Sequence, residues 1–317
     1  MCSNRLKLAF TVAGTVIGAG FATGKELMLF FDSTPRALTC LILCILIMCL
    51  VSLLYFRQAH KRLQFSTDSF VFQLIFLLFS AVSYTVMLAC GGEALWESTG
   101  LARPIGTVLT CAVTLGIVYF GVSNVYRFNM IATPILLVCM AGISVVGLLS
   151  PASLLEASSS QAVNLLIYSG YNLLSVLPVL GALAGTVDKK EGYHGILWGF
   201  CLVAVVGILL KLLLIRYHVL TNQSAIPVLS IISYLGSNLS LIYTVMLYLS
   251  ILTTAVNSLF AVARNKNPLP ASLILLCCSF LGFTPLIETL YPLFGYIGIG
   301  VTVTLIIKAF FKESQKG

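Results

Sequence analysis

Residues 11–31, TVAGTVIGAGFATGKELMLFF, carry four glycines inside an apolar run. Glycine is costly inside a helix unless the backbone must approach something closely or leave the helical conformation. The GxxxG spacings in this stretch fit close packing between two membrane helices. An unwound turn from Gly18 to Gly20 would instead free amide N–H groups for an anionic carboxylate and carbonyl oxygens for a cation. A second stretch of the same kind favours the unwound turn.

That second stretch, YSGYNLLSVLP at 168–178, lies roughly half the chain length further along. It combines Gly170 and Pro178 with tyrosine and amide side chains. A kinked helix with hydrogen-bonded tyrosines would explain this composition. Interrupted helices at matching places in two halves indicate the binding site of a transporter, so we predict a break at 169–172 that forms the opposite wall of a cavity.

A group of hydroxyl side chains lies in LSILTTAVNSLF, residues 249–260. Ser250 and Thr254 are four residues apart and Thr253 adjoins Thr254, so their hydroxyls crowd one sector of a helix. Such hydroxyls often bond carbonyls of their own helix, which is the alternative interpretation. Because hard cations prefer oxygen ligands, these hydroxyls and carbonyls freed at the first break would form a neutral cage suited to sodium.

Lys25 and Glu26 are the charged residues that fall within the membrane depth. They form either a neutralised pair or an outer gate, and simple pairing is slightly favoured. Tyr84 lies in the middle of a predicted span, where its hydroxyl needs a partner or a cavity. The histidines lie at separate predicted helix ends without an HExxH motif or paired carboxylates, which argues against an enzyme.

The composition is that of a membrane protein. Of 317 residues, 59% are hydrophobic and 9% charged, with a mean hydropathy of +1.04, whereas soluble domains carry about a quarter charged residues. A bilayer core about 30 Å thick requires about 20 apolar residues per helix. About ten spans are predicted, at 8–31, 36–57, 70–92, 104–122, 130–149, 160–184, 195–216, 239–263, 270–287 and 290–311, with a surface helix at 225–236.

The basic residues are scattered between apolar segments, although the formal net charge is +8. They are therefore interpreted as topology signals, and no nucleic-acid partner is expected. Most of them fall at cytoplasmic helix ends when the N-terminus is placed in the cytoplasm. This predicts a multi-pass protein of the cell (inner) membrane with both termini cytoplasmic. The first apolar stretch lacks a small-x-small cleavage site and is expected to be a retained helix.

The two glycine-containing stretches would each open one half of the chain, approximately 8–149 and 160–311. Five spans per half is an odd number, so the second half must run inverted relative to the first. We therefore expect one all-α transmembrane domain over residues 1–317, arranged as a five-plus-five inverted repeat with the first and sixth helices broken.

The segments TVIGAGFATGKE, YSGYN and LTTAVNS, at these intervals, resemble the YkvI-like bacterial membrane proteins, which are related to the amino acid–polyamine–organocation superfamily. The resemblance covers nearly the whole chain, and its most specific parts are GAGFATGKE and the threonine pair. It implies the LeuT-type fold, in which spans one, two, six and seven form a moving bundle and spans three, four, eight and nine form a scaffold.

In sodium-coupled members of that fold, one ion lies between the first and eighth helices. Carried over by position, the resemblance implies that the carbonyl ligands of this ion are Gly14, Ile17 and Ser250. It implies that the hydroxyl ligands are Thr253 and Thr254. It also implies a substrate site lined by Ala19, Gly20, Phe21, Tyr84, Ser169, Gly170 and Asn172. Lys25 and Glu26 lie near the outer gate of amino-acid-transporting relatives, so their gating role stays open.

Two functions are consistent with these residues. One is a secondary active transporter, a sodium-coupled symporter of an amino acid or similar small amine, with sodium as coupling ion and no other cofactor. The other is a non-transporting ligand-binding or sensory membrane subunit that resembles spore-germination receptor subunits. Under either function, the expected partners of the protein are a small-molecule substrate and the lipid bilayer. The sequence leaves the solute, the direction, proton against sodium coupling and the oligomeric state open.

Overall fold

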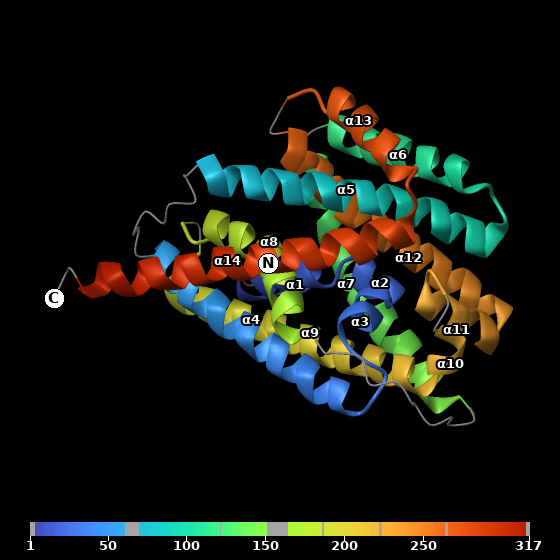
Figure 1. Ribbon diagram of the computed structural model, residues 1–317, viewed down its shortest axis with the longest axis horizontal. Coiled ribbons are helices and arrows are strands. Elements are labelled where there is room, and N and C mark those ends of the chain that lie inside the picture. The colour runs from blue at the N-terminus through green and yellow to red at the C-terminus, as the bar shows by residue number, and fades with distance from the viewer. Residues whose placement is uncertain are drawn as a thin grey trace.

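The computed structural model describes residues 4–60, 70–120, 122–150, 164–185, 187–221, 224–263 and 266–314. These residues are helical or in turns, and no strand occurs among them. Figure 1 shows long helices running along the longest axis, with α14 reaching past the others at the end where the C-terminus lies. The predicted all-α class is confirmed for this part of the chain.

The helices of the first half, in chain order, are α1 (Asn4–Val16), α2 (Ala19–Thr23), α3 (Lys25–Phe30), α4 (Arg36–His60), α5 (Phe70–Thr99), α6 (Arg103–Tyr119) and α7 (Val122–Leu149). Those of the second half are α8 (Leu165–Leu183), α9 (Lys189–Arg216), α10 (His218–Thr221), α11 (Pro227–Leu235), α12 (Ser237–Ala263), α13 (Leu269–Ser279) and α14 (Phe283–Ser314).

Seven of the described helices are long and apolar enough to cross a membrane: α4, α5, α7, α8, α9, α12 and α14. Helices α6 and α13 are apolar but shorter, with 17 and 11 residues. The first predicted span is divided into α1, α2 and α3. The membrane class is therefore supported, whereas the count of ten spans stays a prediction.

The boundary between the last two predicted spans is wrong. We expected it between 287 and 290, next to Glu288, but α13 ends at Ser279 and α14 begins at Phe283. Gly282 adopts φ +95, a left-handed conformation that glycine reaches without strain, so the chain turns there. Glu288 lies inside α14, where its charge is paired instead of marking a loop. The short helix predicted at 225–236 is present as α11 and begins with Pro227 in its first turn.

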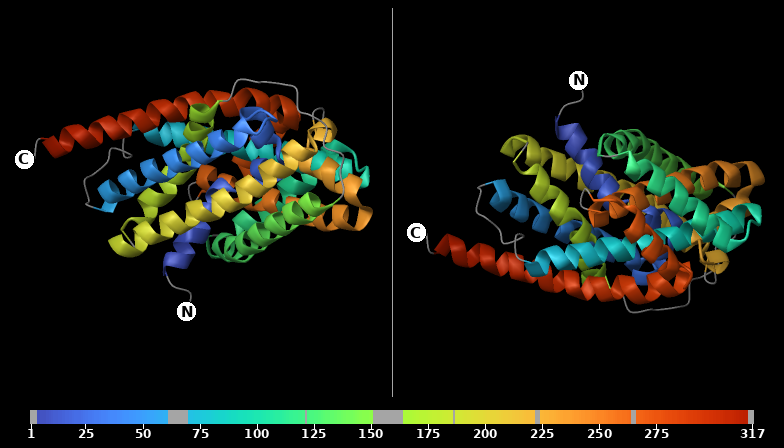
Figure 2. Two further views of the ribbon diagram at one scale, coloured as in Figure 1. Left: turned by 90° about the horizontal axis from the view of Figure 1, so that it is seen from below. Right: turned by 90° about the horizontal axis from the view of Figure 1, so that it is seen from above.

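The first segment is enclosed by the other helices. Helix α1 packs against α7, α8 and α9, helix α2 against α11 and α12, and helix α3 against α8. Helix α8 in turn lies between α4 and α14, and α12 lies against α5 and α7. The left view of Figure 2 shows α4 running lengthwise between α14 and α9, and α4 packs against both. All residues of α2 are buried, so the turn that follows the break has protein on its sides.

Large apolar side chains cover the outside of the molecule. They include Leu46, Val138 and Ile274, whose exposed fractions are 59%, 73% and 66%. A monomeric water-soluble protein rarely exposes so much contiguous apolar surface, whereas lipid tails solvate it. The outward apolar faces of α4, α7 and α13 therefore agree with a bilayer as the solvent.

Helices α8 and α14 cross at very short distance because small residues meet there. Gly170 of α8 faces Gly295 and Gly298 of α14, and a Cβ added at Gly298 would collide with the carbonyl oxygen of Gly170. Close approach of this kind is how membrane helices gain packing energy without a hydrophobic driving force. Gly170 is therefore explained by helix contact.

Replacing Gly298 by alanine should force α14 away from α8. We expect the free energy of unfolding to fall by about 1–3 kcal/mol, measured as a lower thermal midpoint of the purified protein in detergent. Gly300→Ala is the matched control, because nothing lies within 4 Å of a Cβ added there. Equal midpoints for the two variants would contradict the close crossing.

Candidate functional site

The first segment leaves the helical conformation at Ile17 and Gly18. Gly18 is extended, with φ −94 and ψ −169, and α2 begins directly after it. The Gly18 N–H donates to the Val16 carbonyl at 3.0 Å instead of to Gly14, four residues back. A break was expected from Gly18 to Gly20, and the structure places it one residue earlier. The regular backbone bond from Gly18 to the Gly14 carbonyl is therefore not made.

A second interruption follows at Gly24, between α2 and α3. Its φ of +77 is left-handed, and a Cβ there would also meet Val228 of α11. The Thr23 hydroxyl donates to the Gly20 carbonyl at 2.7 Å and accepts the Lys25 N–H at 3.2 Å. A side chain thus supplies bonds that the interrupted backbone cannot form.

Helix α12 faces the break with its hydroxyl side chains. The Ala19 N–H donates to Thr254 Oγ1 at 3.2 Å, and Thr254 Oγ1 donates to the Ser250 carbonyl at 3.1 Å. Thr253 Oγ1 donates to the same carbonyl at 2.8 Å. The Ser250 hydroxyl is buried without a hydrogen-bond partner in the described part of the chain. Oxygens of Ser250, Thr253 and Thr254 therefore gather beside Gly18 and Ala19.

The predicted sodium ligands are thus partly brought together. Ile17 lies in the break itself, next to Gly18, whose Cα carries no side chain against Thr254. Gly14 lies one turn earlier in α1, and a Cβ there would meet Thr133 of α7 at 2.6 Å. No group of three or more His, Cys, Asp or Glu side chains among the described residues is arranged to hold a metal ion. The oxygens available at the break are neutral hydroxyls and carbonyls.

The predicted break in the sixth span is wrong, because α8 runs without interruption through 169–172. Ser169 Oγ donates to the Leu165 carbonyl at 2.8 Å, and Asn172 Nδ2 donates to the Tyr168 carbonyl at 3.0 Å. Both polar side chains form hydrogen bonds with carbonyls of their own helix, so they are accommodated without unwinding of α8. Ser169 Oγ also lies 2.9 Å from Cys44 Sγ of α4.

Tyr84 points to a different part of the molecule from the break. Its hydroxyl lies 2.8 Å from Ser272 Oγ of α13 and 3.3 Å from Thr114 Oγ1 of α6. All three side chains are fully buried. The structure therefore joins Tyr84 to α6 and α13, and not to Ala19, Gly20 or α8.

The interpretation of Lys25 and Glu26 as a mutual pair is wrong. Lys25 Nζ pairs with Glu288 Oε1 of α14 at 3.0 Å. The Glu26 side chain turns the other way and is only 4% exposed. Adjacent residues of a helix point about 100° apart, so neighbours in sequence do not face each other.

Glu26 ends among aromatic rings of α8 and α14. Tyr171 Oη donates to Glu26 Oε1 at 3.2 Å, and Tyr171 stacks on Tyr291 with ring centroids 4.3 Å apart. A Cβ added at Gly20 would collide with Glu26 Oε1, so the carboxylate lies directly over the first turn of α2. Sequence reasoning did not place Tyr291 in the site. Glu288 and Tyr291 are about one helical turn apart in α14, so the face that pairs with Lys25 of α3 also carries Tyr291.

A second buried charge was missing from the sequence-based site. Lys211 of α9 is fully buried, and Nζ donates to the carbonyls of Leu27 and Phe31 at 3.1 and 3.0 Å. These are carbonyls at the end of α3 that have no further turn of helix to bond. Lys211 therefore caps the C-terminal end of α3.

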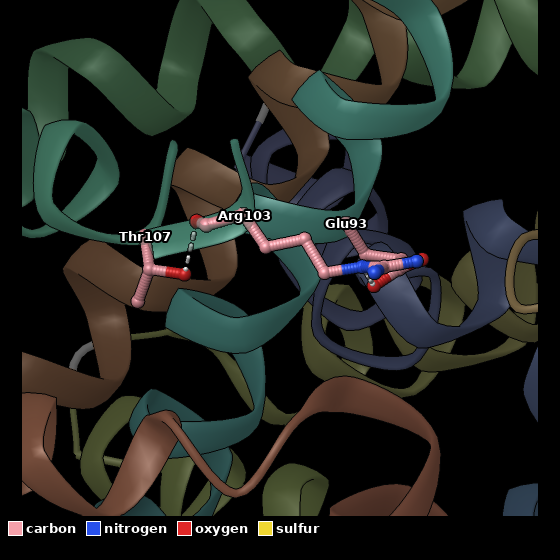
Figure 3. Close-up of polar contacts among 3 residues, drawn as sticks. All are labelled: Glu93, Arg103 and Thr107. Atoms are coloured by element: carbon pink, nitrogen blue, oxygen red, sulfur yellow. Dashed lines mark hydrogen bonds and ion pairs between the residues drawn. The ribbon is translucent and has the colours of Figure 1, made fainter. Parts of the chain in front are cut away.

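The turn between α5 and α6 is held by a separate ion pair. Figure 3 shows Arg103 reaching Glu93, with Nε–Oε2 and Nη2–Oε1 distances of 2.6 and 2.9 Å, and Thr107 Oγ1 bonded to the Arg103 carbonyl. The Arg103 guanidinium also lies 5.0 Å from the centre of the Trp96 ring. Glu93 thus has its own cation, unlike Glu26.

Comparisons with known proteins agree with a membrane protein of this kind. No protein-family model matches the chain. The chain is 23% identical to the uncharacterized membrane protein YkvI of Bacillus subtilis (strain 168), over 95% of each chain. It is also 23% identical to the uncharacterized protein YyaD of the same organism, over 95% of this chain and 96% of the relative.

Solved structures with a similar fold are membrane transporters. Mhp1 in an inward-facing conformation aligns with a TM-score of 0.60 and 13% identity over 94% of this chain and 75% of that chain. A manganese transporter of Eremococcus coleocola aligns with a TM-score of 0.50 and 11% identity over 99% of this chain and 72% of that chain. The chain therefore shares an overall helical fold with these two transporters. The inverted repeat and its boundaries stay predictions.

Tyr84 should stabilise the scaffold formed by α5, α6 and α13. Tyr84→Phe leaves the buried Ser272 and Thr114 hydroxyls without this partner, so we expect a loss of about 1–3 kcal/mol in unfolding free energy. Tyr119→Phe is the control, because Tyr119 is 67% exposed. Thermal midpoints in detergent measure both, and an unchanged midpoint for Tyr84→Phe would contradict this structural role.

Proposed function

We propose that the protein is a secondary active transporter, a sodium-coupled symporter of an amino acid or similar small amine that works by alternating access. The observation that carries the proposal is the bond between the Ala19 N–H in the break of the first segment and Thr254 Oγ1 of α12. This bond links the backbone that leaves the helix to a cluster of hydroxyls inside a membrane protein. Irregular backbone is tolerated there only when protein or a solute supplies its hydrogen bonds.

The oxygens at this point suit a monovalent cation. Thr254 Oγ1 accepts the Ala19 N–H and donates to Ser250 O, which leaves one lone pair free. Thr253 Oγ1 donates to the same carbonyl and keeps both lone pairs. Carbonyl oxygens at Gly14 and Ile17 would complete the cage. An ion entering the cage would bind the Ser250 carbonyl while both hydroxyls rotate away from it and stay protonated, so every ligand would remain a neutral oxygen.

Ion binding and solute binding would be linked through α2. Ala19, Gly20 and Phe21 form the first turn after the break and are fully buried. An ion held between Ile17 and Thr254 fixes where this turn begins, and thereby fixes the groups that face a solute. A ligand that favours one arrangement of the broken segment favours binding of the other ligand by the same free energy.

The test is uptake into proteoliposomes of a panel of radiolabelled amino acids and small amines, with and without an inward sodium gradient. We expect sodium to stimulate uptake by the wild-type protein. Thr254→Ala should raise the sodium concentration for half-maximal uptake by about tenfold, the effect of losing about 1.4 kcal/mol of ligand energy. Thr254→Ser keeps the hydroxyl and should restore coupling.

Thr304→Ala is the matched control for this experiment. Thr304 is an exposed threonine of α14 whose hydroxyl bonds the Gly300 carbonyl of its own helix. Uptake that is independent of sodium and insensitive to Thr254→Ala would reject the coupling. Solute binding without any flux would reject transport and favour the ligand-binding or sensory subunit.

A further inference from the structure

Glu26 has an incomplete set of partners. Its side chain is buried, Oε1 accepts the Tyr171 hydroxyl, and Oε2 has no hydrogen-bond partner among the residues that the structure describes. A buried polar oxygen without a partner costs free energy, and a charged one costs far more. The position therefore calls for a further donor or cation that is not part of the described chain.

The basic side chains near Glu26 are engaged elsewhere. Lys25 pairs with Glu288, and Lys211 donates to the carbonyls of Leu27 and Phe31. Neither is therefore bonded to the Glu26 carboxylate in this conformation. Ionisable residues inside membrane segments that lack a charged partner point to a substrate, ion or proton site.

The rings around Glu26 favour an organic cation. Tyr171 lies in a stack with Tyr291 at 4.3 Å, with the Phe30 ring 6.4 Å away and the Phe79 ring 5.6 Å away. Aromatic faces attract ammonium groups, more strongly when water is excluded, whereas a small metal ion prefers a cage of oxygens. The oxygens beside Thr254 offer such a cage, so the two positions differ in chemistry.

Gly20 allows the carboxylate to reach the break. Glu26 belongs to α3, yet its Oε1 lies where a Cβ of residue 20 would stand. The carboxylate therefore covers the turn that follows Gly18, between α2 and the Tyr171 side of α8. A carboxyl group held over this turn is placed to contact a solute that binds there.

We propose that the Glu26 carboxylate binds the protonated amine of the solute, with Tyr171 orienting Oε1 and the Tyr171–Tyr291 pair contacting the ammonium group. This deepens the proposed function and rests on it, since the solute is taken to bind at the break. The chemical class is a primary or substituted ammonium compound, whether a simple amine or the amino end of an amino acid.

Binding to the full-length protein in lipid nanodiscs tests the assignment. The probes are propylamine, phenethylamine, alanine and phenylalanine, with propanol and phenethyl alcohol as neutral counterparts. We expect at least one ammonium probe to raise the thermal midpoint, while its alcohol does not, because a ligand that binds only the folded protein stabilises it. Glu26→Gln should weaken that probe by about 10- to 100-fold, the value of a hydrogen bond to a charged group.

Glu191→Gln is the matched control, because Glu191 forms a loose 3.8 Å pair with Arg5 at another helix end. It should change the affinity by less than about threefold. Unaltered affinity in Glu26→Gln would overturn the proposal, as would the absence of stabilisation by every ammonium probe. Stabilisation by sodium that is lost in Glu26→Gln, without any amine effect, would also overturn it in favour of an inorganic cation.

A measurement on the wild-type protein covers the case in which Glu26→Gln fails to fold. A membrane-permeant carbodiimide modifies buried carboxyl groups, and mass spectrometry locates the label. Modification is counted as the carbodiimide adduct plus any amide formed with the amine. The stabilising amine should slow this total modification of Glu26 at least about fivefold while that of Glu191 is unchanged, since a factor of five corresponds to about 1 kcal/mol. Equal labelling of Glu26 with and without the amine would overturn the proposal.

Failure of this assignment is distinguishable from failure of the transport function. Amine binding that depends on Glu26 without flux in proteoliposomes keeps the assignment and rejects transport. Sodium-driven flux that Glu26→Gln leaves unchanged keeps transport and rejects the assignment.

Discussion

The structure depends on one constraint: main chain that leaves the helical conformation inside a membrane must find its hydrogen bonds within the protein. The first segment leaves that conformation at Ile17–Gly18 and again at Gly24. Side chains of two other helices then supply the missing bonds. Thr254 of α12 accepts the Ala19 N–H, Tyr243 of α12 donates to the Ala22 carbonyl at 2.6 Å, and Lys211 of α9 caps the end of α3.

The interruptions of the first segment and the intact helix α8 are held in different ways. Side-chain hydrogen bonds bridge each interruption, from Thr254 at the first and from Thr23 and Tyr243 at the second. Helix α8 is the opposite case. Its Ser169 and Asn172 bond their own helix, and its Gly170 is packed against α14 without room for a methyl group. The broken segment thus depends on bonds from other side chains, whereas α8 depends on its own helix and on close packing against α14.

The charged side chains around α3 follow the same division. Lys211 donates to carbonyls at the C-terminal end of α3, and Lys25 at the N-terminal end pairs with Glu288. Both ends of α3 are therefore held. Glu26 has an oxygen left over, directly above the first turn of α2. In a medium of low dielectric constant this imbalance favours a bound cation, and the tyrosines around it favour an organic one. The neutral oxygens near Thr254 suit a metal cation, so two different positive ligands would share one broken helix.

The sequence by itself determined the membrane class, the position of most helices and the first interruption. Apolar length reports span, and a dense glycine run weakens a helix wherever it lies. It also brought Thr254 into consideration, because Ser250 and Thr254 are four residues apart and share a helix face whatever surrounds them.

Only the tertiary structure decided what the second glycine stretch does. A glycine in a membrane helix permits either unwinding or close contact, and the neighbour determines which: Gly170 meets the backbone of α14, so α8 stays intact. The same holds for charge. Lys25 and Glu26 are adjacent in sequence, yet one reaches α14 and the other turns over Gly20. Whether a charged side chain has an oppositely charged partner depends on the helices packed around it, and the local sequence does not indicate which helices those are.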